Sequence, residues 1–520
     1  MIEERDSEEV RESGGCKPIP AKEILRLIEK GEDVKFENRV IEGDLDLERG
    51  DLPKIHFADS RVDSKKINFI TSEISLVNCC LRGVFNIHNS IFYKPVNFND
   101  TIFTNNLILE GSIFRDESKF VGMISRKDIK SRYAQFSKEA DFRNSKFEGD
   151  VDFRDARFKI ANFRDAQFKK RAWFDSTNFN EARFWRSRFE KYAGFGGSRF
   201  YGKCRFNHVR FNENADFNNA HFEDDFLFCE AKFDKRANFK STNSARNATL
   251  NFERAKFNED SDFTHSVFYG DVNFGNAIFI GYANFNETKF NKNLILNNSR
   301  IYDMSLGSSF GCESDIILEG ANFDKLRCLI WDDIKDHLDD YRYDGAIYLA
   351  LVNNFKNIER FDDADNCYYK FRLISQGQKH WYDPKKSWLY RFNWSKLYDH
   401  VAWRSCGYGI RPIFTLAWIF GSIFGFTVLY RILGGITKSS TPEITMTALN
   451  NSTLLFLSAT SKTSPTFWEC LYFSALSFIG GTPVGHSTVG AWKYAVMFES
   501  VLGYLFLALF VVVLARKLIR

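Results

Sequence analysis

The stretch ADFRNSKFEGDVDFRDARFKIANFRDAQF (residues 140–168) repeats phenylalanine at steps of five or six residues. Neither a helix, with its period of 3.6 residues, nor a strand, with its period of 2, accounts for this spacing. A chain that turns a corner every five or six residues does account for it, because each face then sends one equivalent side chain inward. The repeated residues, which we expect to form an inward-facing structural ladder, are Phe142, Phe147, Phe153, Phe158, Phe163 and Phe168.

The repeat unit extends well beyond this stretch. Two residues before many of the phenylalanines stands a small residue, usually alanine, and the residue between them is usually Asp, Asn or Arg. The unit continues to Phe239, resumes at Phe252 and runs to Phe290, and a last copy ends at Phe323. Weaker copies, with Leu or Ile at some of the Phe positions, precede the stretch at Leu81, Ile87, Phe92, Phe98, Phe103, Leu109, Phe114 and Phe120.

This pattern resembles that of the pentapeptide-repeat family, and the resemblance covers residues 41–323. It implies a right-handed, four-sided (quadrilateral) β-solenoid, in which successive coils stack at strand spacing, about 4.8 Å. The alternation of five and six residues predicts about 22 residues per coil, and hence roughly 13 coils that each contact only their neighbours. The small residue two positions before each Phe also points inward in this arrangement.

Two segments before the repeat and two within it depart from the pattern. Residues 1–20 are polar and acidic, and we expect them to be disordered. Residues 21–40 contain apolar residues in a charged background, which predicts a short helix that caps the solenoid. The polar stretches 121–133 and 240–250 are expected to loop out of the coil, either as tolerated insertions or as contact sites.

The composition argues against several classes of function. Residues 134–240 carry about 22 Lys and Arg against about 17 Asp and Glu, a mixed surface on which we expect no nucleic-acid binding. The ten cysteines form no CxxC pair and no Cys/His group with metal spacing, so we expect reduced thiols and no metal site. Because no nucleophile–base pair or phosphate-binding loop is recognisable, we expect no catalytic residue, no enzyme activity and no cofactor.

Residues 324–411 lack the repeat and are expected to form a helical connector followed by an interfacial segment. Within them, residues 345–376 show helical spacing and predict two short helices. The residues that follow are rich in Trp and Tyr with Lys and Arg between them, which favours the lipid headgroup region over a soluble aromatic core. This interfacial segment contains Trp381, Trp388, Trp394, Trp403, Arg391, Lys396, Arg404 and Arg411.

The last part of the chain, residues 412–520, has two apolar runs that suffice to cross a bilayer, at about 412–433 and 492–515. Basic residues flank the first run on its N-terminal side and also follow the second run. The positive-inside rule therefore places both the N- and the C-terminus in the cytoplasm. We expect a multi-pass protein of the cell membrane, with two spans and the lipid bilayer as a partner.

Between the two runs, residues 464–485 hold an apolar stretch too short to span a bilayer, followed by a loop rich in glycine. This order of span, short helix, loop and second span resembles the two-transmembrane pore module of the potassium-channel superfamily, which has a re-entrant pore helix. The resemblance is good at residues 471–478 and 499–520. It fails at the filter, where GGTPVG (480–485) replaces the family pattern Thr-x-Gly-Tyr/Phe-Gly-Asp, so potassium selectivity is not implied. The pore or filter candidates are Ser477, Phe478, Ile479, Gly480, Gly481, Thr482, Pro483 and Glu499.

Two hypotheses for the whole chain remain open at this point. The leading one is an ion channel formed by a homotetramer, since one loop per chain supplies a quarter of a filter, with the cytosolic solenoid as a docking, assembly or sensing domain for a protein partner. The alternative is a non-conducting, membrane-anchored scaffold for protein–protein interaction. Glu499 either attracts ions or braces the pore helix, or it is an interfacial residue that reaches water. The permeant ion is not specified by the sequence.

Overall fold

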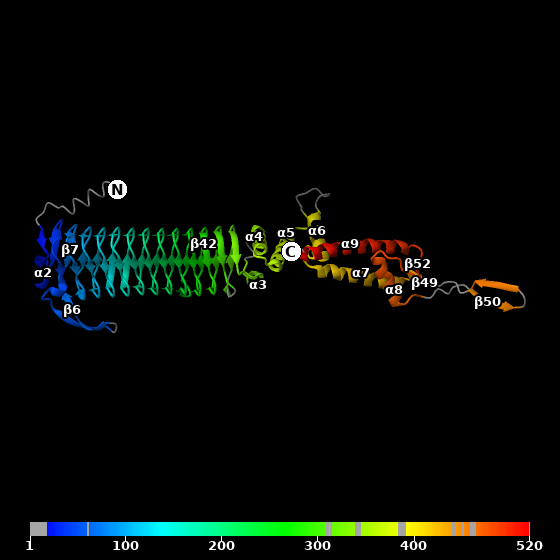
Figure 1. The fold of residues 1–520 in the computed structure, drawn as a ribbon, viewed down its shortest axis with the longest axis horizontal. Coiled ribbons are helices and arrows are strands. Elements are labelled where there is room, and N and C mark those ends of the chain that lie inside the picture. Colours follow the sequence, from blue (N-terminus) through cyan, green and yellow to red (C-terminus); the bar gives the residue numbers. More distant parts are fainter. Residues whose placement is uncertain are drawn as a thin grey trace. The chain divides into compact units, whose positions relative to one another are not determined.

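The computed structural model describes residues 18–59, 62–307, 311–312, 315–338, 345–382, 392–438, 444–449, 452–457 and 464–518. The chain divides into two compact units, Met1–Ala364 and Asp365–Arg520 (Figure 1). Each unit is described by itself below. The first contains the repeat, and the second contains the apolar helices.

The first unit is a parallel β-solenoid of about 13 turns. Each short strand pairs in parallel with its equivalent in the next turn, as Ile102 does with Ile124, 22 residues later. Four such ladders run along the unit, one for each face of the coil. Figure 1 shows the turns stacked in sequence order. The four strands of one turn are β12 (Ile102–Phe103), β13 (Leu107–Ile108), β14 (Ile113–Phe114) and β15 (Ser118–Lys119).

Phenylalanine rings fill the interior of the solenoid in columns. The rings of Phe142 and Phe163, one turn apart, have centroids separated by 4.8 Å and planes inclined by only 3°. The ring of Phe153 meets that of Phe142 edge-on at 5.7 Å, so neighbouring columns interlock in the geometry that aromatic pairs favour. The six ladder phenylalanines of residues 140–168 are at most 1% exposed. Buried alanines such as Ala140 and Ala161 stand in register beside them.

Every second corner of the coil uses a residue with positive φ. Asn144, Asp155 and Asp165, each two positions after a ladder phenylalanine, have φ angles of 58°, 61° and 59°. Asn and Asp enter this left-handed region more readily than other non-glycine residues, which explains why they recur there. Beside the first of these corners, the buried hydroxyl of Ser145 donates to the carbonyl oxygen of Phe120 in the preceding turn at 2.7 Å. The corners therefore add hydrogen bonds between turns that the short strands alone do not provide.

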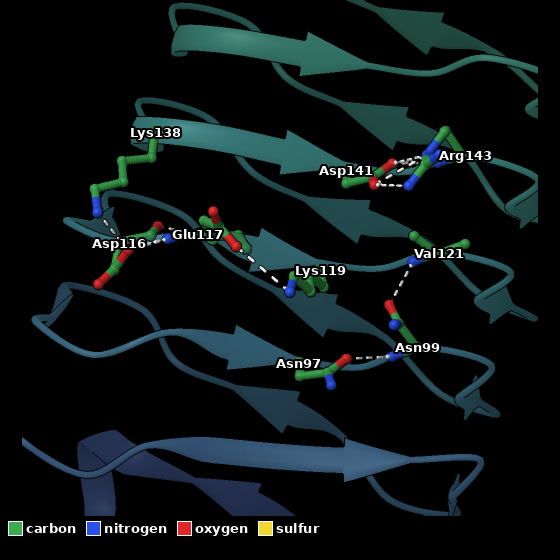
Figure 2. Close-up of polar contacts among 10 residues, drawn as sticks. Asn97, Asn99, Asp116, Glu117, Lys119, Val121, Lys138, Asp141 and Arg143 are labelled. Atoms are coloured by element: carbon green, nitrogen blue, oxygen red, sulfur yellow. Dashed lines mark hydrogen bonds and ion pairs between the residues drawn. The ribbon is translucent and has the colours of Figure 1, made fainter.

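Polar side chains at other corners join each turn to the next. The carboxylate of Asp128 accepts a hydrogen bond from the backbone N–H of Asp150 at 2.9 Å, and Asp150 in turn accepts one from the N–H of Arg171 at 3.0 Å. Figure 2 shows an equivalent bond, in which the side chain of Asn99 accepts from the backbone N–H of Val121 at 3.0 Å. The same view shows the ion pair Lys138–Asp116, which joins neighbouring turns, and the pairs Arg143–Asp141 and Lys119–Glu117, which lie within one turn.

The prediction that residues 121–133 loop out of the coil is wrong. Both ladder strands of this stretch pair in register with the turns before and after it. Ser125 stands at the ladder position that Phe147 occupies one turn later. Met123 is fully buried at a position where other turns have a small residue, and its larger side chain compensates for the small Ser125. The large and small side chains are thus exchanged in this turn, so the Phe spacing disappears while the coil continues.

Insertions do occur elsewhere in the solenoid. Residues 240–250 also carry ladder strands, contrary to expectation, and the turn is only lengthened, since Phe226 pairs with Leu250, 24 residues later. A larger insertion, which the sequence did not reveal, is the antiparallel hairpin of β5 (Lys54–Asp59) and β6 (Val62–Ile70). Residues 240–250 are therefore part of the coil, and the hairpin is an addition to it.

The N-terminal end of the solenoid begins earlier than the repeat pattern. Strand β1 (Ile19–Pro20) pairs in parallel with β3 (Val40–Glu42), so the ladder starts before residue 41 and residues 19–20 are ordered in it. The rest of the segment expected to be disordered, residues 1–17, lies outside the described residues. Helix α2 (Ala21–Glu29) lies within the segment predicted to form a capping helix and buries Ala21, Ile24 and Ile28.

The C-terminal end of the solenoid is closed by a helix. The last strand, β48 (Asn322–Arg327), runs four residues past the final repeat phenylalanine, and the short helix α3 (Trp331–Ile334) follows it. Helix α4 (Gly345–Asn357) then packs on β48. The buried side chain of Asn354 accepts from the N–H of Leu326 at 2.8 Å and donates to its carbonyl oxygen at 3.0 Å. Asn354 thus replaces the next strand and protects an open sheet edge.

The second unit consists mainly of helices. Among the described residues, α7 (Pro412–Leu433) and α9 (Trp492–Leu518) are the two helices long and apolar enough to cross a membrane. The first coincides with the predicted span 412–433, and the second begins as predicted at residue 492 but continues three residues beyond 515. The other helices of the second unit are α5 (Phe361–Gln378, which belongs to this unit from Asp365 onward), α6 (Trp394–Cys406) and α8 (Phe467–Phe478). Its strands are the pair β49 (Ile436–Lys438) and β52 (His486–Thr488) and the hairpin β50 (Ile444–Leu449) and β51 (Ser452–Leu457).

Candidate functional site: the C-terminal helix bundle

Helices α7, α8 and α9 pack against one another in the second unit. Pro412 opens α7 at the first helical position, where its missing N–H costs nothing, and Gly434 ends the helix with a φ of 62°. Helix α8 starts with a capping box, in which Thr466 and Glu469 each bond the other's backbone N–H. The Thr466 N–H and the Lys438 ammonium group lower the pKa of the Glu469 carboxyl to about 2.

Helix α8 runs back along the two longer helices and stops halfway. Its start lies beside the C-terminal end of α7, because Glu469 pairs with Lys438 in β49 at 3.0 Å. Further along, the hydroxyl of Ser474 donates to the carbonyl oxygen of Ile423, in the middle of α7, at 2.9 Å. At the end of α8, the carbonyl of Phe478 lies so close to Gly503 of α9 that a Cβ there would meet its oxygen at 1.8 Å. Helix α8, with 12 residues and a length of about 18 Å, thus passes the middle of α7 and ends beside the middle of α9.

The loop after α8 has irregular backbone and is exposed in this unit. Gly480 and Gly485 have φ angles of 78° and 77°, the left-handed region that favours glycine. Ile479 is 55% exposed and Val484 is 80% exposed. The chain then returns to the C-terminal end of α7, because His486 in β52 pairs with β49, which follows α7. Residues 479–485 therefore rise from the middle of the bundle to the end at which α8 began.

The structure separates the predicted site residues into two groups. Gly480, Gly481, Thr482 and Pro483 lie in the loop, and a Cβ at Gly480 would meet the hydroxyl of Tyr504 at 1.9 Å. The others belong to helices: Ser477 and Phe478 are buried in the last turn of α8, Ile479 follows its end, and Glu499 is buried in α9.

Glu499 does not reach solvent in this unit, contrary to its reading as an interfacial residue. Its side chain is 0% exposed, and the hydroxyl of Tyr430 in α7 donates to its Oε2 at 2.7 Å. Its Oε1 contacts the hydroxyl of Ser474 in α8. Tyr430 and Ser474 were not recognised in the sequence, because an aromatic residue near a span end suggests an interface and a serine in a short apolar helix carries no signal. Their positions 69 and 25 residues from Glu499 are brought together only by the fold.

The interfacial segment is partly described. Trp381 is 36% exposed and Trp394 is 59% exposed, whereas the indole N–H of Trp403 donates to the hydroxyl of Tyr369 in α5 at 2.9 Å. Lys396 and Arg411 lie against aromatic rings, and Arg404 is exposed at the end of α6. Trp388 and Arg391 fall outside the described residues. Across the described part of the chain, no group of three or more His, Cys, Asp and Glu is placed to hold a metal ion.

Comparison with known proteins identifies the repeat and gives no match to the helix bundle. The family model described as Pentapeptide repeats (9 copies) matches residues 132–178, 195–243 and 252–300, and no channel family matches. No curated protein and no solved structure gives a significant match to the chain. The predicted resemblance to pentapeptide repeats is confirmed, whereas the pore resemblance rests on the geometry of the bundle. The first unit of this protein is a β-solenoid built from pentapeptide repeats.

Proposed function

We propose that this protein is a membrane protein in which several copies, most simply four, enclose an ion-conducting pore lined by residues 479–485. The observation that carries the proposal is the position of α8. It packs against two apolar helices, passes the middle of α7, ends beside the middle of α9 and is followed by irregular, exposed backbone. This is the arrangement expected of a re-entrant pore helix and its loop.

The lipid environment supplies the physical reason for several copies. If α7 and α9 cross a bilayer, the loop after α8 lies at the depth of the hydrocarbon core. Irregular backbone at that depth has unsatisfied N–H and C=O groups, and it is tolerated only where it is buried in protein or lines a water-filled cavity. In a single copy Ile479 and Val484 are exposed, so further copies are needed to enclose the loop and a pore between them.

The same proposal assigns roles to the two ends of the chain. Arg411 stands immediately before α7, and Arg516 and Lys517 are exposed in the last turn of α9. By the positive-inside rule these ends face the cytoplasm, and the solenoid, which precedes α7, lies there too. The solenoid then serves as a docking, assembly or sensing domain for a protein partner, without enzyme activity.

A second candidate, a non-conducting membrane-anchored scaffold, is favoured by one specific contact. The loop lacks the residues of a potassium filter, and Gly480 is held against the hydroxyl of Tyr504 in α9. A loop packed onto its own helix at this point has less freedom to arrange a ring of carbonyl groups around an ion. The solenoid would then be the functional part of the molecule, and the helices its anchor.

Ion flux separates the two candidates. The full chain, purified in detergent, is reconstituted in liposomes under separate gradients of K⁺, Na⁺ and Cl⁻, with empty liposomes as the control. The pore proposal predicts flux of at least one ion and a tetrameric mass in detergent. A stable monomer or dimer without flux of any of these ions would support the scaffold and contradict the pore.

A further inference from the structure

Three helices meet at one buried carboxyl group in the second unit. Glu499 of α9 is 0% exposed, and its two oxygens contact the hydroxyl groups of Tyr430 in α7 and Ser474 in α8. The Ser474 hydroxyl is also 2.9 Å from the carbonyl oxygen of Ile423 in α7. This carboxyl group is therefore the point at which the short helix is fastened to both long ones.

The charges around the carboxyl group do not balance an ionised glutamate. Among the described residues, no Lys, Arg or His nitrogen lies within 4.0 Å of it, since Glu499 forms no ion pair. The titratable group that contacts it is the Tyr430 hydroxyl from α7, the Cys470 thiol from α8 lies in the same apolar cluster as Tyr430, and neither carries a positive charge. An isolated buried carboxylate costs several kcal/mol, and such groups normally take up a proton instead.

The supply of protons points the same way. The single hydroxyl proton of Ser474 has two neighbouring acceptors, Oε1 of Glu499 and the carbonyl oxygen of Ile423. If Glu499 carries a proton on Oε1, it donates to Ser474, Ser474 donates to Ile423, and Tyr430 donates to Oε2, so every contact has its own proton. The carbonyl oxygen of Ile423 also accepts from the hydroxyl of Thr427 at 2.7 Å, so it does not depend on Ser474 alone for a donor. The proton count therefore favours the neutral acid, but the absence of a nearby cation is the stronger argument for it.

We propose that Glu499 is held as a neutral carboxylic acid and is the positioning residue that ties α8 to α7 and α9. Loss of its proton to solvent leaves a buried carboxylate without a cation, and the Ser474 hydroxyl, which then donates to that carboxylate, gives up its bond to the carbonyl oxygen of Ile423 in α7. The end of α8 and the loop 479–485 are then released. The effect of this release on a pore rests on the proposed function, whereas the protonation state of Glu499 does not.

Infrared spectroscopy of the full chain in detergent tests the protonation state directly. A buried carboxylic acid gives a C=O stretching band that an ionised carboxylate lacks, and we expect such a band at neutral pH in the wild type and its loss in Glu499→Gln. Because Ser474→Ala removes the acceptor of the acid proton, it should shift the band to higher wavenumber. The matched control is Ser500→Ala, which removes a 2.7 Å bond from α9 to the carbonyl oxygen of Ser477 in α8 without touching Glu499 and should leave the band in place.

Thermal unfolding gives a second, independent readout. A glutamine side chain can donate to Ser474 and accept from Tyr430 at any pH, so Glu499→Gln should keep the wild-type unfolding temperature at neutral pH. The variant should also lack the loss of stability with rising pH that we expect of the wild type. Absence of the acid band in the wild type, or a band that Glu499→Gln and Ser474→Ala both leave unchanged, would overturn the proposal. Because neither readout involves conductance, an acid band without ion flux would retain the neutral glutamate and refute only the pore.

Discussion

Replacing Gly503 by alanine should drive α8 away from α9 and abolish conductance. An alanine Cβ would lie 1.8 Å from the carbonyl oxygen of Phe478, and ordinary contact begins at 3.4 Å, so the end of α8 must move by about 1.6 Å (3.4 − 1.8). Both partners of this clash are fixed by the backbone, because Cβ is attached to Cα and the oxygen belongs to a main-chain carbonyl. No side-chain rotation can relieve it, and the loop after α8 has to move as well.

The expected energy follows from two opposing terms. Overpacking a tight contact costs about 1–3 kcal/mol, and alanine gains about 1 kcal/mol over glycine in a helix. For a contact this short we expect the upper end of the first range, and thus a net loss of about 2 kcal/mol. The matched control is Gly425→Ala in α7, where a Cβ has nothing within 4 Å, so the helix gain of about 1 kcal/mol should stand alone.

The assay compares thermal unfolding in detergent with ion flux in liposomes for the two variants and the wild type. Gly503→Ala should unfold at lower temperature and lose flux, whereas Gly425→Ala should unfold at the same or a higher temperature and keep flux. If the two variants behaved alike, the close approach of Phe478 to Gly503 would not hold α8 in place, which would contradict the prediction.

Three further predictions concern the solenoid and the cap of α8. Phe153→Ala, which removes a fully buried ring from the column that it shares with Phe174, should lower the free energy of unfolding by about 3–5 kcal/mol in denaturant titrations, and an unchanged midpoint would contradict the ladder. Asn354→Leu, which removes both bonds to Leu326, should expose the sheet edge and increase self-association in light scattering; a purely monodisperse variant would argue against the protective role. The stabilisation by Glu469 should be complete above the pKa of an unfolded glutamate, about 4.3, and be lost as the pH falls toward its folded value of about 2; Glu469→Gln should abolish that acid dependence in unfolding curves, and an identical dependence in the variant would contradict it.

The sequence predicted the fold well wherever each repeat places its own Phe at the inward position, because the regular spacing is then visible. The phenylalanines around residue 153 predicted the coil because their spacing is set by local corners. Helix α7 was predictable because it carries no charge from Ile413 to Tyr430 and lies between a proline and a glycine. The coil at residues 121–133 was missed because Ser125 and Met123 exchange large and small side chains across neighbouring positions, which conserves volume without conserving the pattern. The hairpin of β5 and β6 was missed for a different reason, since an insertion into one turn leaves the spacing of the others unchanged.

The candidate site was predictable only in part. The glycines at 480 and 481 stood out because they follow a short apolar helix, and Glu499 stood out because it is a carboxyl group in an apolar run. The contacts that give these residues meaning depend on the packing of three helices. Tyr430, Ser474 and Gly503 have no local signal, since a hydroxyl group or a missing Cβ matters only when a distant segment approaches it.

Accessibility of the loop during conduction tests the central claim most directly. Thr482 is exposed in the middle of residues 479–485, and Thr482→Cys places a thiol there. With the wild type as the control for the native cysteines, a membrane-impermeant thiol reagent should block ion flux through liposomes that contain the variant and leave wild-type flux unchanged. Full labelling of the variant with undiminished flux, or no flux in either protein, would contradict a pore lined by this loop.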